Sequence, residues 1–171
     1  MIDLVLGGAR SGKSQFAEQQ VRNSSLQPIY IATAQALDNE MASRISHHQN
    51  SRAAQPVNWI TIEEPIALAH CLTKVSHEHV VLVDCLTLWL TNCLLHEDPK
   101  CWQKQRLEFL NTIAACPAHL ILVSNEVGHG IVPLGEINRQ FVDEAGWLHQ
   151  AIAKNATSVH FIMAGCSLKL K

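Results

Sequence analysis

The stretch "MIDLVLGGARSGKSQF" (residues 1–16) decides the fold of this chain. Its apolar run, residues 2–6, has the length and composition of a short buried strand. Residues 7–14 match the pattern G-x-x-x-x-G-K-[ST], in which a glycine-rich loop joins a strand to a helix. The residues that follow have helical spacing, so strand, loop and helix occur in the required order. The stretch therefore predicts a loop that holds nucleotide phosphates.

Each residue type in this loop has a physical reason. Gly7, Gly8 and Gly12 are expected to allow backbone conformations that a Cβ atom resists, so that several N–H groups converge on phosphate oxygens. The start of the following helix adds positive potential at the same place. Lys13 would reach the β- and γ-phosphates, and the Ser14 hydroxyl would be a ligand of Mg²⁺, which prefers hard oxygen atoms.

The rest of the chain alternates short β-rich runs with stretches of helical spacing. Strands are expected at residues 2–6, 28–32, 57–62, 80–84, 119–123 and 158–163. Helices are expected after the loop and at residues 38–51, 65–76, 86–95, 99–116 and 134–155, with Gly146 as a candidate break in the last. This alternation predicts one α/β domain over residues 1–171, with a mostly parallel sheet and helices packed over it. Ligands of such sheets bind beyond the carboxyl ends of the strands.

Composition excludes several classes of protein. Of the 171 residues, 47% are hydrophobic and 16% are charged, which is typical of a globular domain. The formal net charge of -2 argues against a dedicated nucleic-acid binder, which would carry a basic face. No apolar run is long enough to span a membrane, and the N-terminus does not resemble a signal peptide. None of the six cysteines forms a C-x-x-C pair, so we expect reduced thiols in a cytoplasmic protein.

A candidate acidic partner of the loop ends the run "VVLVD" (residues 80–84). An acid at the end of an apolar strand, in a chain that also has the phosphate loop, is the usual second ligand of Mg²⁺. We therefore assign Asp84 to the metal together with Ser14. The alternative is that Asp84 only caps the helix that follows it.

The stretch "RISHHQNSR" (residues 44–52) carries two adjacent histidines. His48 continues the stripe of Met41 and Ile45 at helical spacing, so it is expected to face inward. His47 lies about 100° further round the helix, on the polar face, where a neutral imidazole could attack a phosphorus atom. Taken alone, two neighbouring histidines in a chain with ten of them more often have no special role.

Several motifs together change that interpretation. The segments "GGARSGKS", "YIATAQALDNEM", "RISHHQNSR", "VDCLTLWLTN", "NEVGHGIVP" and "RQFVDEAGWLHQ" occur in this order along nearly the whole chain. Together they resemble the bifunctional adenosylcobinamide kinase / adenosylcobinamide-phosphate guanylyltransferase family of cobalamin biosynthesis. The loop motif is generic, whereas "NEVGHGIVP" (125–133) and "SRISHH" (43–48) are specific to this family.

The resemblance implies two reactions on a P-loop NTPase domain of the RecA-like type. In the first, ATP or GTP phosphorylates the hydroxyl of the aminopropanol arm of adenosylcobinamide. In the second, a histidine takes GMP from GTP and releases pyrophosphate, and adenosylcobinamide phosphate then accepts the GMP to give adenosyl-GDP-cobinamide. The first histidine of the pair, His47 here, is the family's guanylylated residue, and Lys13 serves both reactions. The family also implies Mg²⁺, a homotrimer and a cytoplasmic location.

The resemblance also implies which residues contact the nucleotide. These residues are Gly7, Gly8, Ala9, Arg10, Ser11, Gly12, Lys13, Ser14, Ala32, Thr33, Ala34, His48, Gln49, Asn50, Ser51, Glu63 and Asp84. Asn125, Glu126 and Gly128 would shape the cobinamide side of the site or a subunit interface. The chain departs from the family pattern in a longer segment between His48 and Trp59, and in His149, where an asparagine is usual.

Two other functions compete with this interpretation. A plain P-loop kinase of small molecules would need the loop, while the histidine pair would be structural. A GTPase switch would use "DEAG" (143–146) as its D-x-x-G motif, but this motif lies in a helical stretch and no N-K-x-D guanine motif occurs. Protein-bound GMP separates the family's bifunctional chemistry from both alternatives.

Overall fold

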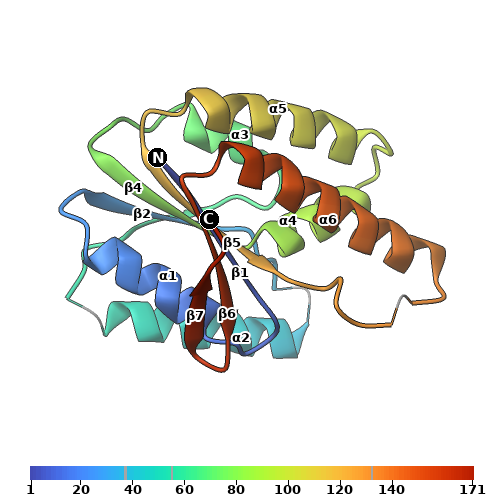
Figure 1. Ribbon diagram of the computed structural model, residues 1–171, viewed down its shortest axis with the longest axis horizontal. Coiled ribbons are helices and arrows are strands. Elements are labelled where there is room, and N and C mark those ends of the chain that lie inside the picture. The colour runs from blue at the N-terminus through green and yellow to red at the C-terminus, as the bar shows by residue number, and fades with distance from the viewer. Residues whose placement is uncertain (37, 55, 132) are drawn as a thin grey trace.

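One twisted sheet organises the molecule, which is a computed structural model describing residues 1–36, 38–54, 56–131 and 133–171 (Figure 1). Its seven strands lie in the order β3-β2-β4-β5-β1-β6-β7. All neighbours are parallel except β6 and β7, so the predicted mostly parallel sheet is confirmed. The strands are β1 (Ile2–Gly7), β2 (Gln27–Ala32), β3 (Ile60–Glu63), β4 (His79–Asp84), β5 (His119–Asn125), β6 (Ser158–Met163) and β7 (Cys166–Lys169).

Two strands differ from expectation. The strand expected at residues 57–62 begins only at Ile60, because the Trp59 N–H donates to the carbonyl oxygen of Val57 at 3.2 Å in a local turn. The Trp59 side chain packs edge-on against Tyr30, with ring centroids 6.0 Å apart. β7 was not expected at all. It forms an antiparallel hairpin with β6 through Ala164 and Gly165, whose φ angles of 51° and 78° are the left-handed values that a tight two-residue turn requires.

Six helices connect the strands in the described part of the chain. They are α1 (Lys13–Arg22), α2 (Asn39–Ala53), α3 (Leu68–Leu72), α4 (Leu86–Leu94), α5 (Cys101–Ala115) and α6 (Glu136–Asn155). α3 is shorter than the helix expected at residues 65–76, because the Glu64 carboxylate accepts hydrogen bonds from the backbone of Ile66 and Ala67 ahead of it. α6 runs unbroken through Gly146, since one glycine costs a helix only about 1 kcal/mol and Leu148 and Ile152 are buried.

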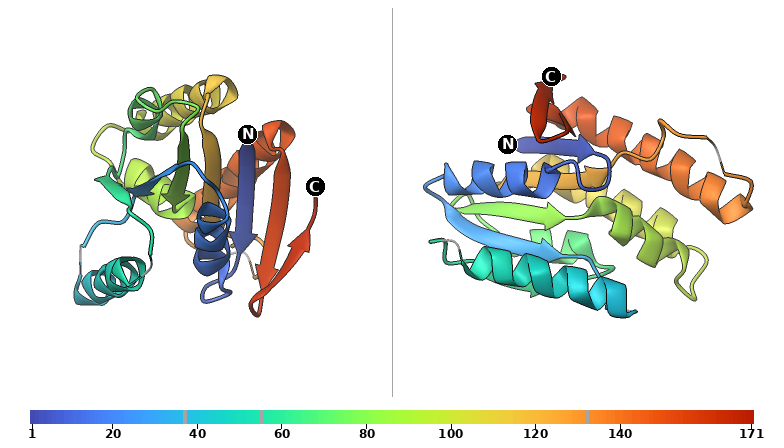
Figure 2. Two further views of the ribbon diagram at one scale, coloured as in Figure 1. Left: turned by 90° about the vertical axis from the view of Figure 1, so that its left-hand side faces the viewer. Right: turned by 90° about the horizontal axis from the view of Figure 1, so that it is seen from below.

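The helices cover both faces of the sheet, as predicted (Figure 2). Helices α3, α4, α5 and α6 lie over one face, where the larger core is centred on Trp89, Trp102 and Phe109, all of them almost fully buried. α1 covers the other face with Ala17 and Val21. α2 lies on the same side as α1 but stands away from the sheet, and most of its side chains are exposed.

The quoted motif residues Leu37 and Val132, and Gln55 in the segment after the histidine pair, lie outside the described residues. Among the residues that are described, no helix is long and apolar enough to cross a membrane.

Candidate active site

The strand register brings the predicted site residues to one edge of the sheet. Ala32, at the end of β2, pairs with Asp84 at the end of β4 and with Glu63 at the end of β3. Gly7, at the end of β1, pairs with Asn125 at the end of β5. β5 lies between β1 and β4, so a single strand separates the phosphate loop from Asp84. The carboxyl edge therefore holds the loop and Asp84 one strand apart, as expected for a parallel sheet. Glu63 is at the same edge, but three strands separate β3 from β1.

The phosphate loop is fixed by contacts within itself. The Lys13 side chain is 9% exposed, and its Nζ donates to the carbonyl oxygen of Gly8 at 3.2 Å. The Ser11 N–H donates to the same oxygen at 3.3 Å. Ser11 Oγ is buried and has no hydrogen-bond partner among the described residues. A buried hydroxyl and an ammonium held together over a helix N-terminus form a cradle suited to phosphate oxygens.

The expected role of the loop glycines needs correction. Of Gly7, Gly8 and Gly12, only Gly12 has a left-handed φ, at 94°, and Arg10 is the second left-handed residue of the loop, at 56°. Gly7 is required by space instead, because a Cβ atom there would lie 2.5 Å from Ser11 Oγ and 2.6 Å from a backbone oxygen of β6. A Cβ atom at Gly8 would meet no atom of the described residues within 4 Å.

The C-terminal hairpin packs against this loop. The Gly165 N–H donates to the carbonyl oxygen of Ser11 at 2.8 Å. A Cβ atom on Gly12 would lie 3.3 Å from Gly165 Cα. The loop is thus held from outside by a segment at the far end of the sequence, which sequence analysis did not detect.

Asp84 is the last residue of β4 and is half-buried at the carboxyl edge of the sheet. Its Oδ2 accepts a hydrogen bond from the hydroxyl of Tyr30 at 3.2 Å. The next residue, Cys85, has a pKa of about 11, because it is buried and, secondly, because it lies near the negative charge of Asp84. Its thiol therefore stays neutral and is not a nucleophile at physiological pH.

Thr33 links β2 to the turn after β4. Its hydroxyl donates to the carbonyl oxygen of Cys85 at 2.8 Å and accepts from the Cys85 N–H at 2.9 Å. Its own carbonyl oxygen accepts from the side-chain amide of Asn92 at 2.8 Å. Thr33 is fully buried by these contacts, so the predicted nucleotide contact of this residue stays a prediction. Glu63, in contrast, is exposed at the end of β3.

α2 presents the histidine pair to solvent. Asp38 caps the helix by accepting from the Met41 N–H at 2.7 Å. His47 and His48 are both exposed, with ring centroids 6.1 Å apart, so the expectation that His48 faces inward is wrong. Arg52, one turn further on, is the buried side chain among those of α2 that the structure describes. The three predicted contacts that follow the pair, Gln49, Asn50 and Ser51, are exposed as well.

Residues after β5 contact the loop from its other side. The Glu126 N–H donates to the carbonyl oxygen of Gly7 at 3.0 Å, and its carboxylate accepts from the Gly128 N–H. The second carboxylate oxygen of Glu126 lies 3.9 Å from Nδ1 of His149, whose Nε2 is 2.7 Å from the Ser124 hydroxyl. His149 therefore occupies a buried polar position behind the site instead of a surface position.

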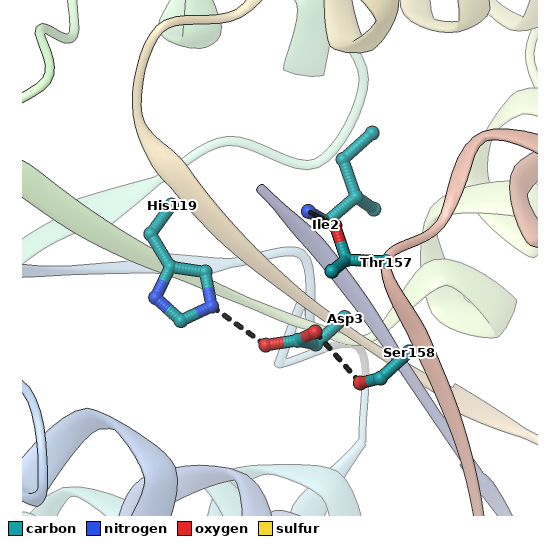
Figure 3. Close-up of polar contacts among 5 residues, drawn as sticks. All are labelled: Ile2, Asp3, His119, Thr157 and Ser158. Atoms are coloured by element: carbon teal, nitrogen blue, oxygen red, sulfur yellow. Dashed lines mark hydrogen bonds and ion pairs between the residues drawn. The ribbon is translucent and has the colours of Figure 1, made fainter. Parts of the chain in front are cut away.

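A second polar cluster lies at the opposite, amino end of the sheet (Figure 3). Asp3 accepts from the Ser158 hydroxyl at 2.7 Å and lies 2.6 Å from Nε2 of His119. Burial alone would raise the pKa of Asp3, but these contacts outweigh it and hold the pKa below 3.8. Because it lies at the edge away from the loop, this cluster joins β1, β5 and β6 and does not belong to the site.

The sequence matches the family described as cobinamide kinase / cobinamide phosphate guanyltransferase over residues 3–170. The chain belongs to this family. The expected family and enzyme class are thereby confirmed, and a strand–loop–helix at the carboxyl edge is the nucleotide-binding frame such an enzyme needs. The plain kinase is not favoured, and "DEAG" (143–146) lies inside α6, where a GTPase switch motif would not be.

Curated relatives of this family member span its whole length. It is 53% identical to the bifunctional adenosylcobalamin biosynthesis protein CobP of Pseudomonas aeruginosa, over 100% of this chain and 98% of that protein. It is 42% identical to the CobU protein of Escherichia coli and 38% identical to that of Salmonella typhimurium, with full coverage of both chains. Both CobU proteins are likewise described as bifunctional adenosylcobalamin biosynthesis proteins.

A solved structure supports the fold. The RadB recombinase superposes with a TM-score of 0.52, covering 94% of this chain and 73% of that one, at 16% sequence identity. At this identity the likeness concerns the fold alone, and it agrees with the expected RecA-like P-loop domain.

The residues assigned to Mg²⁺ have suitable chemistry. Ser14, in the first turn of α1, offers a hydroxyl, and Asp84 offers a carboxylate at the same edge of the sheet. Among the described residues no group of three or more His, Cys, Asp or Glu side chains could hold a metal. Two oxygen ligands from protein are what Mg²⁺ uses when phosphates and water supply the others.

Proposed function

We propose that one phosphate loop serves both reactions of this family and that, in the second reaction, His47 carries GMP from GTP to adenosylcobinamide phosphate. The observation that carries this proposal is the carboxyl edge of the sheet, where the loop and Asp84 meet one strand apart while α2 offers an exposed His47. In the first reaction, the hydroxyl of adenosylcobinamide attacks the γ-phosphorus of ATP or GTP and the nucleoside diphosphate leaves. Lys13 and the loop N–H groups would stabilise the charge that develops on the transferred group.

In the second reaction, a ring nitrogen of His47 attacks the α-phosphorus of GTP. The bond to the β-phosphate oxygen breaks, and pyrophosphate leaves. A phosphate oxygen of adenosylcobinamide phosphate then attacks the same phosphorus, which frees His47 and gives adenosyl-GDP-cobinamide. Splitting the transfer over a covalent intermediate predicts ping-pong kinetics. Ser14 and Asp84 would hold Mg²⁺, which supplies charge neutralisation for the phosphates.

His47 lies in the middle of α2, away from the helix start. His47 is the ninth residue of a helix that begins at Asn39, so it lies about 12 Å along the axis from the helix start at the carboxyl edge. The attacking nitrogen must come within about 3–3.5 Å of the α-phosphorus. We therefore propose that α2 moves toward the loop when GTP binds. A GTP-bound structure in which α2 has not moved would contradict this proposal.

Mass spectrometry after incubation with GTP and Mg²⁺ tests the guanylyl-histidine directly. We expect one GMP on the protein, located at His47 by peptide mapping, and acid treatment should release it. His47→Ala should lose the adduct and keep kinase activity, whereas His48→Ala, which alters the neighbouring exposed ring, should keep both. An adduct that persists in His47→Ala would overturn the assignment.

The homotrimer is a further proposal, and exposed apolar side chains support it. Ile131 is 99% exposed and Leu134 is 96% exposed, in the segment between β5 and α6, and Ile137 in the first turn of α6 is also exposed. Large apolar side chains grouped on a surface are typical of contacts between subunits. Sedimentation of the wild type and of Leu134→Ser tests the assembly, with a monomeric wild type as the contradicting result. The cytoplasmic location stays a prediction.

A further inference from the structure

α2 packs against the sheet through a buried arginine, Arg52. Of the α2 side chains that the structure describes, only that of Arg52 is buried, at 6% exposure, while those of His47 and His48 are exposed. Arginine is among the residue types least often buried without a partner. Arg52 lies in the last turn of α2, so the helix is held near its C-terminal end.

The partner of Arg52 is an aromatic ring. Its guanidinium carbon lies 3.6 Å from the centroid of the Tyr30 ring, which belongs to β2. The Arg52 Nη1 atom is buried and has no hydrogen-bond partner among the described residues, so this side of the guanidinium depends on the ring face for contact. A desolvated cation over an aromatic face is a favourable pair. Trp59 packs edge-on against the same ring and fixes its position.

Tyr30 continues the connection to the phosphate site. Its hydroxyl donates to Oδ2 of Asp84 at 3.2 Å, and the two residues lie on adjacent parallel strands. Burial, and after it the charge of Asp84, raises the pKa of Tyr30 well above its usual value, while Arg52 opposes this rise. Tyr30 therefore remains a protonated donor to Asp84, and the third charged group near its ring is Glu18 of α1.

We propose that Arg52 and Tyr30 are positioning residues for the guanylylation of His47: the Arg52–Tyr30 contact is the pivot of α2, and Tyr30 connects this pivot to Asp84. The proposal rests on the proposed roles of His47 and Asp84. His47 precedes Arg52 by five residues, about 7.5 Å along the helix, so a small rotation about the pivot displaces the imidazole. A ligand that draws Asp84 Oδ2 away from the Tyr30 hydroxyl shifts the position of the Tyr30 ring and, through Arg52, the position of α2. Because such coupling is reciprocal, a shift of α2 also changes the affinity of the Asp84 site for that ligand.

The test compares the two reactions in three single variants and one double variant. Arg52→Gln removes the cation, Arg52→Lys keeps a charge without the planar group, and Tyr30→Phe keeps the ring but removes the hydroxyl that reaches Asp84. The rate of GMP adduct formation on His47 is measured by mass spectrometry under single-turnover conditions, and the kinase rate is measured with ATP. Lys104→Gln, an exposed charge removed from α5, is the matched control. Thermal unfolding of each variant confirms that it is folded.

We expect Arg52→Gln to slow adduct formation by about tenfold, with less than about a twofold change in the kinase rate. Arg52→Lys should recover part of the loss. Because Tyr30 acts through Arg52, the double variant Tyr30→Phe/Arg52→Gln should be no slower than Arg52→Gln alone. Equal loss of both reactions, multiplicative losses in the double variant, or an unchanged adduct rate in Arg52→Gln would each overturn the proposal. If Arg52→Gln does not fold, the rate of adduct formation and the kinase rate are compared in Arg52→Lys and Tyr30→Phe instead.

Failure of the pivot and failure of the proposed function give different results. If the wild type and Lys104→Gln form no adduct at His47, the guanylyl-histidine itself is wrong. If both form it and Arg52→Gln forms it equally fast, only the pivot is wrong.

Discussion

The N–H of Gly165 donates a hydrogen bond to the carbonyl oxygen of Ser11 in the phosphate loop, at 2.8 Å. The two residues are far apart in sequence and meet because β6 pairs with β1 and the β6–β7 turn then reaches back over the loop. The turn carries Gly165 at a φ of 78° and has space around it, so its backbone conformation decides whether this hydrogen bond forms.

Gly165→Ala should weaken nucleotide binding. An added Cβ atom meets no atom of the described residues within 4 Å, so the substitution strains only the left-handed backbone, at a cost of about 1–2 kcal/mol. If the turn relaxes away from this conformation, the Ser11 carbonyl loses its donor and the loop loses its fixed shape. Isothermal titration with GTP should show the loss of affinity. An unchanged dissociation constant would contradict the prediction.

Ala164→Gly is the matched control for the same turn. Ala164 already has a left-handed φ of 51°, so glycine relieves strain there. We expect binding of GTP at the wild-type level. A loss of affinity as large as that of Gly165→Ala would mean that the turn tolerates no change of any kind.

Lys13→Ala should damage both reactions. Its ammonium is held inside the loop through the carbonyl oxygen of Gly8, where it is preorganised for phosphate charge. Removal of one preorganised donor costs about 10²- to 10³-fold in rate. Kinase turnover and formation of the GMP adduct are measured separately on the same protein. An intact kinase reaction would exclude a phosphate site shared by the two reactions.

His149 should make stability depend on pH. Burial lowers the pKa of His149 below 6.5, with the charge of Glu126 opposing this shift. Below pH 6.5 the unfolded chain therefore binds a proton that the folded chain resists, so the free energy of unfolding falls as the pH falls through this range. His149→Gln should flatten this fall in urea unfolding at a series of pH values. His77→Gln, an exposed histidine, should leave it unchanged, and identical slopes for the two variants would refute the prediction.

Asp3 should stabilise the amino end of the sheet at neutral pH. The hydrogen bonds of His119 and Ser158 hold the pKa of Asp3 below 3.8, so its contribution is present above that value and is lost as the pH falls further. Asp3→Asn weakens or removes these charge-assisted contacts and should cost about 1–3 kcal/mol. Chemical unfolding at pH 7 and pH 3 should show a larger difference between variant and wild type at pH 7 than at pH 3. Asp143→Asn, an exposed carboxylate of α6, should show neither effect.

Much of the fold could be predicted because its signals are local. The pattern at residues 7–14 is set by adjacent residues. β4 and β5 contain continuous apolar runs at residues 80–83 and 120–123, because both faces of the sheet are covered there. β1 and β6 are mostly apolar but are interrupted by Asp3 and His160. β7 was not predicted, because its four residues are all exposed and their alternation of apolar and polar side chains is too short to be a strong signal of a strand. The turn before it depends on a left-handed alanine, which no composition rule suggests.

The orientation of α2 was predicted only in part. Helical spacing placed the helix correctly, but the apolar stripe that ended at His48 led to the wrong inward residue. Arg52 takes that position because Tyr30 presents a ring face to it, and Tyr30 lies on a strand that comes before α2 in the sequence. The contact depends on two side chains 22 positions apart, which no local pattern connects.

The sequence by itself determined the phosphate loop, the parallel sheet that carries it and the family, because each rests on the order of residues along the chain. Only the tertiary structure decided that Gly165 supports the loop, that Glu126 and His149 lie behind it, and that Arg52 holds the helix of His47. These contacts join elements that folding brings together through strand pairing and burial. The residues in these contacts are close in space but far apart in the sequence, so spacing along the chain does not reveal them.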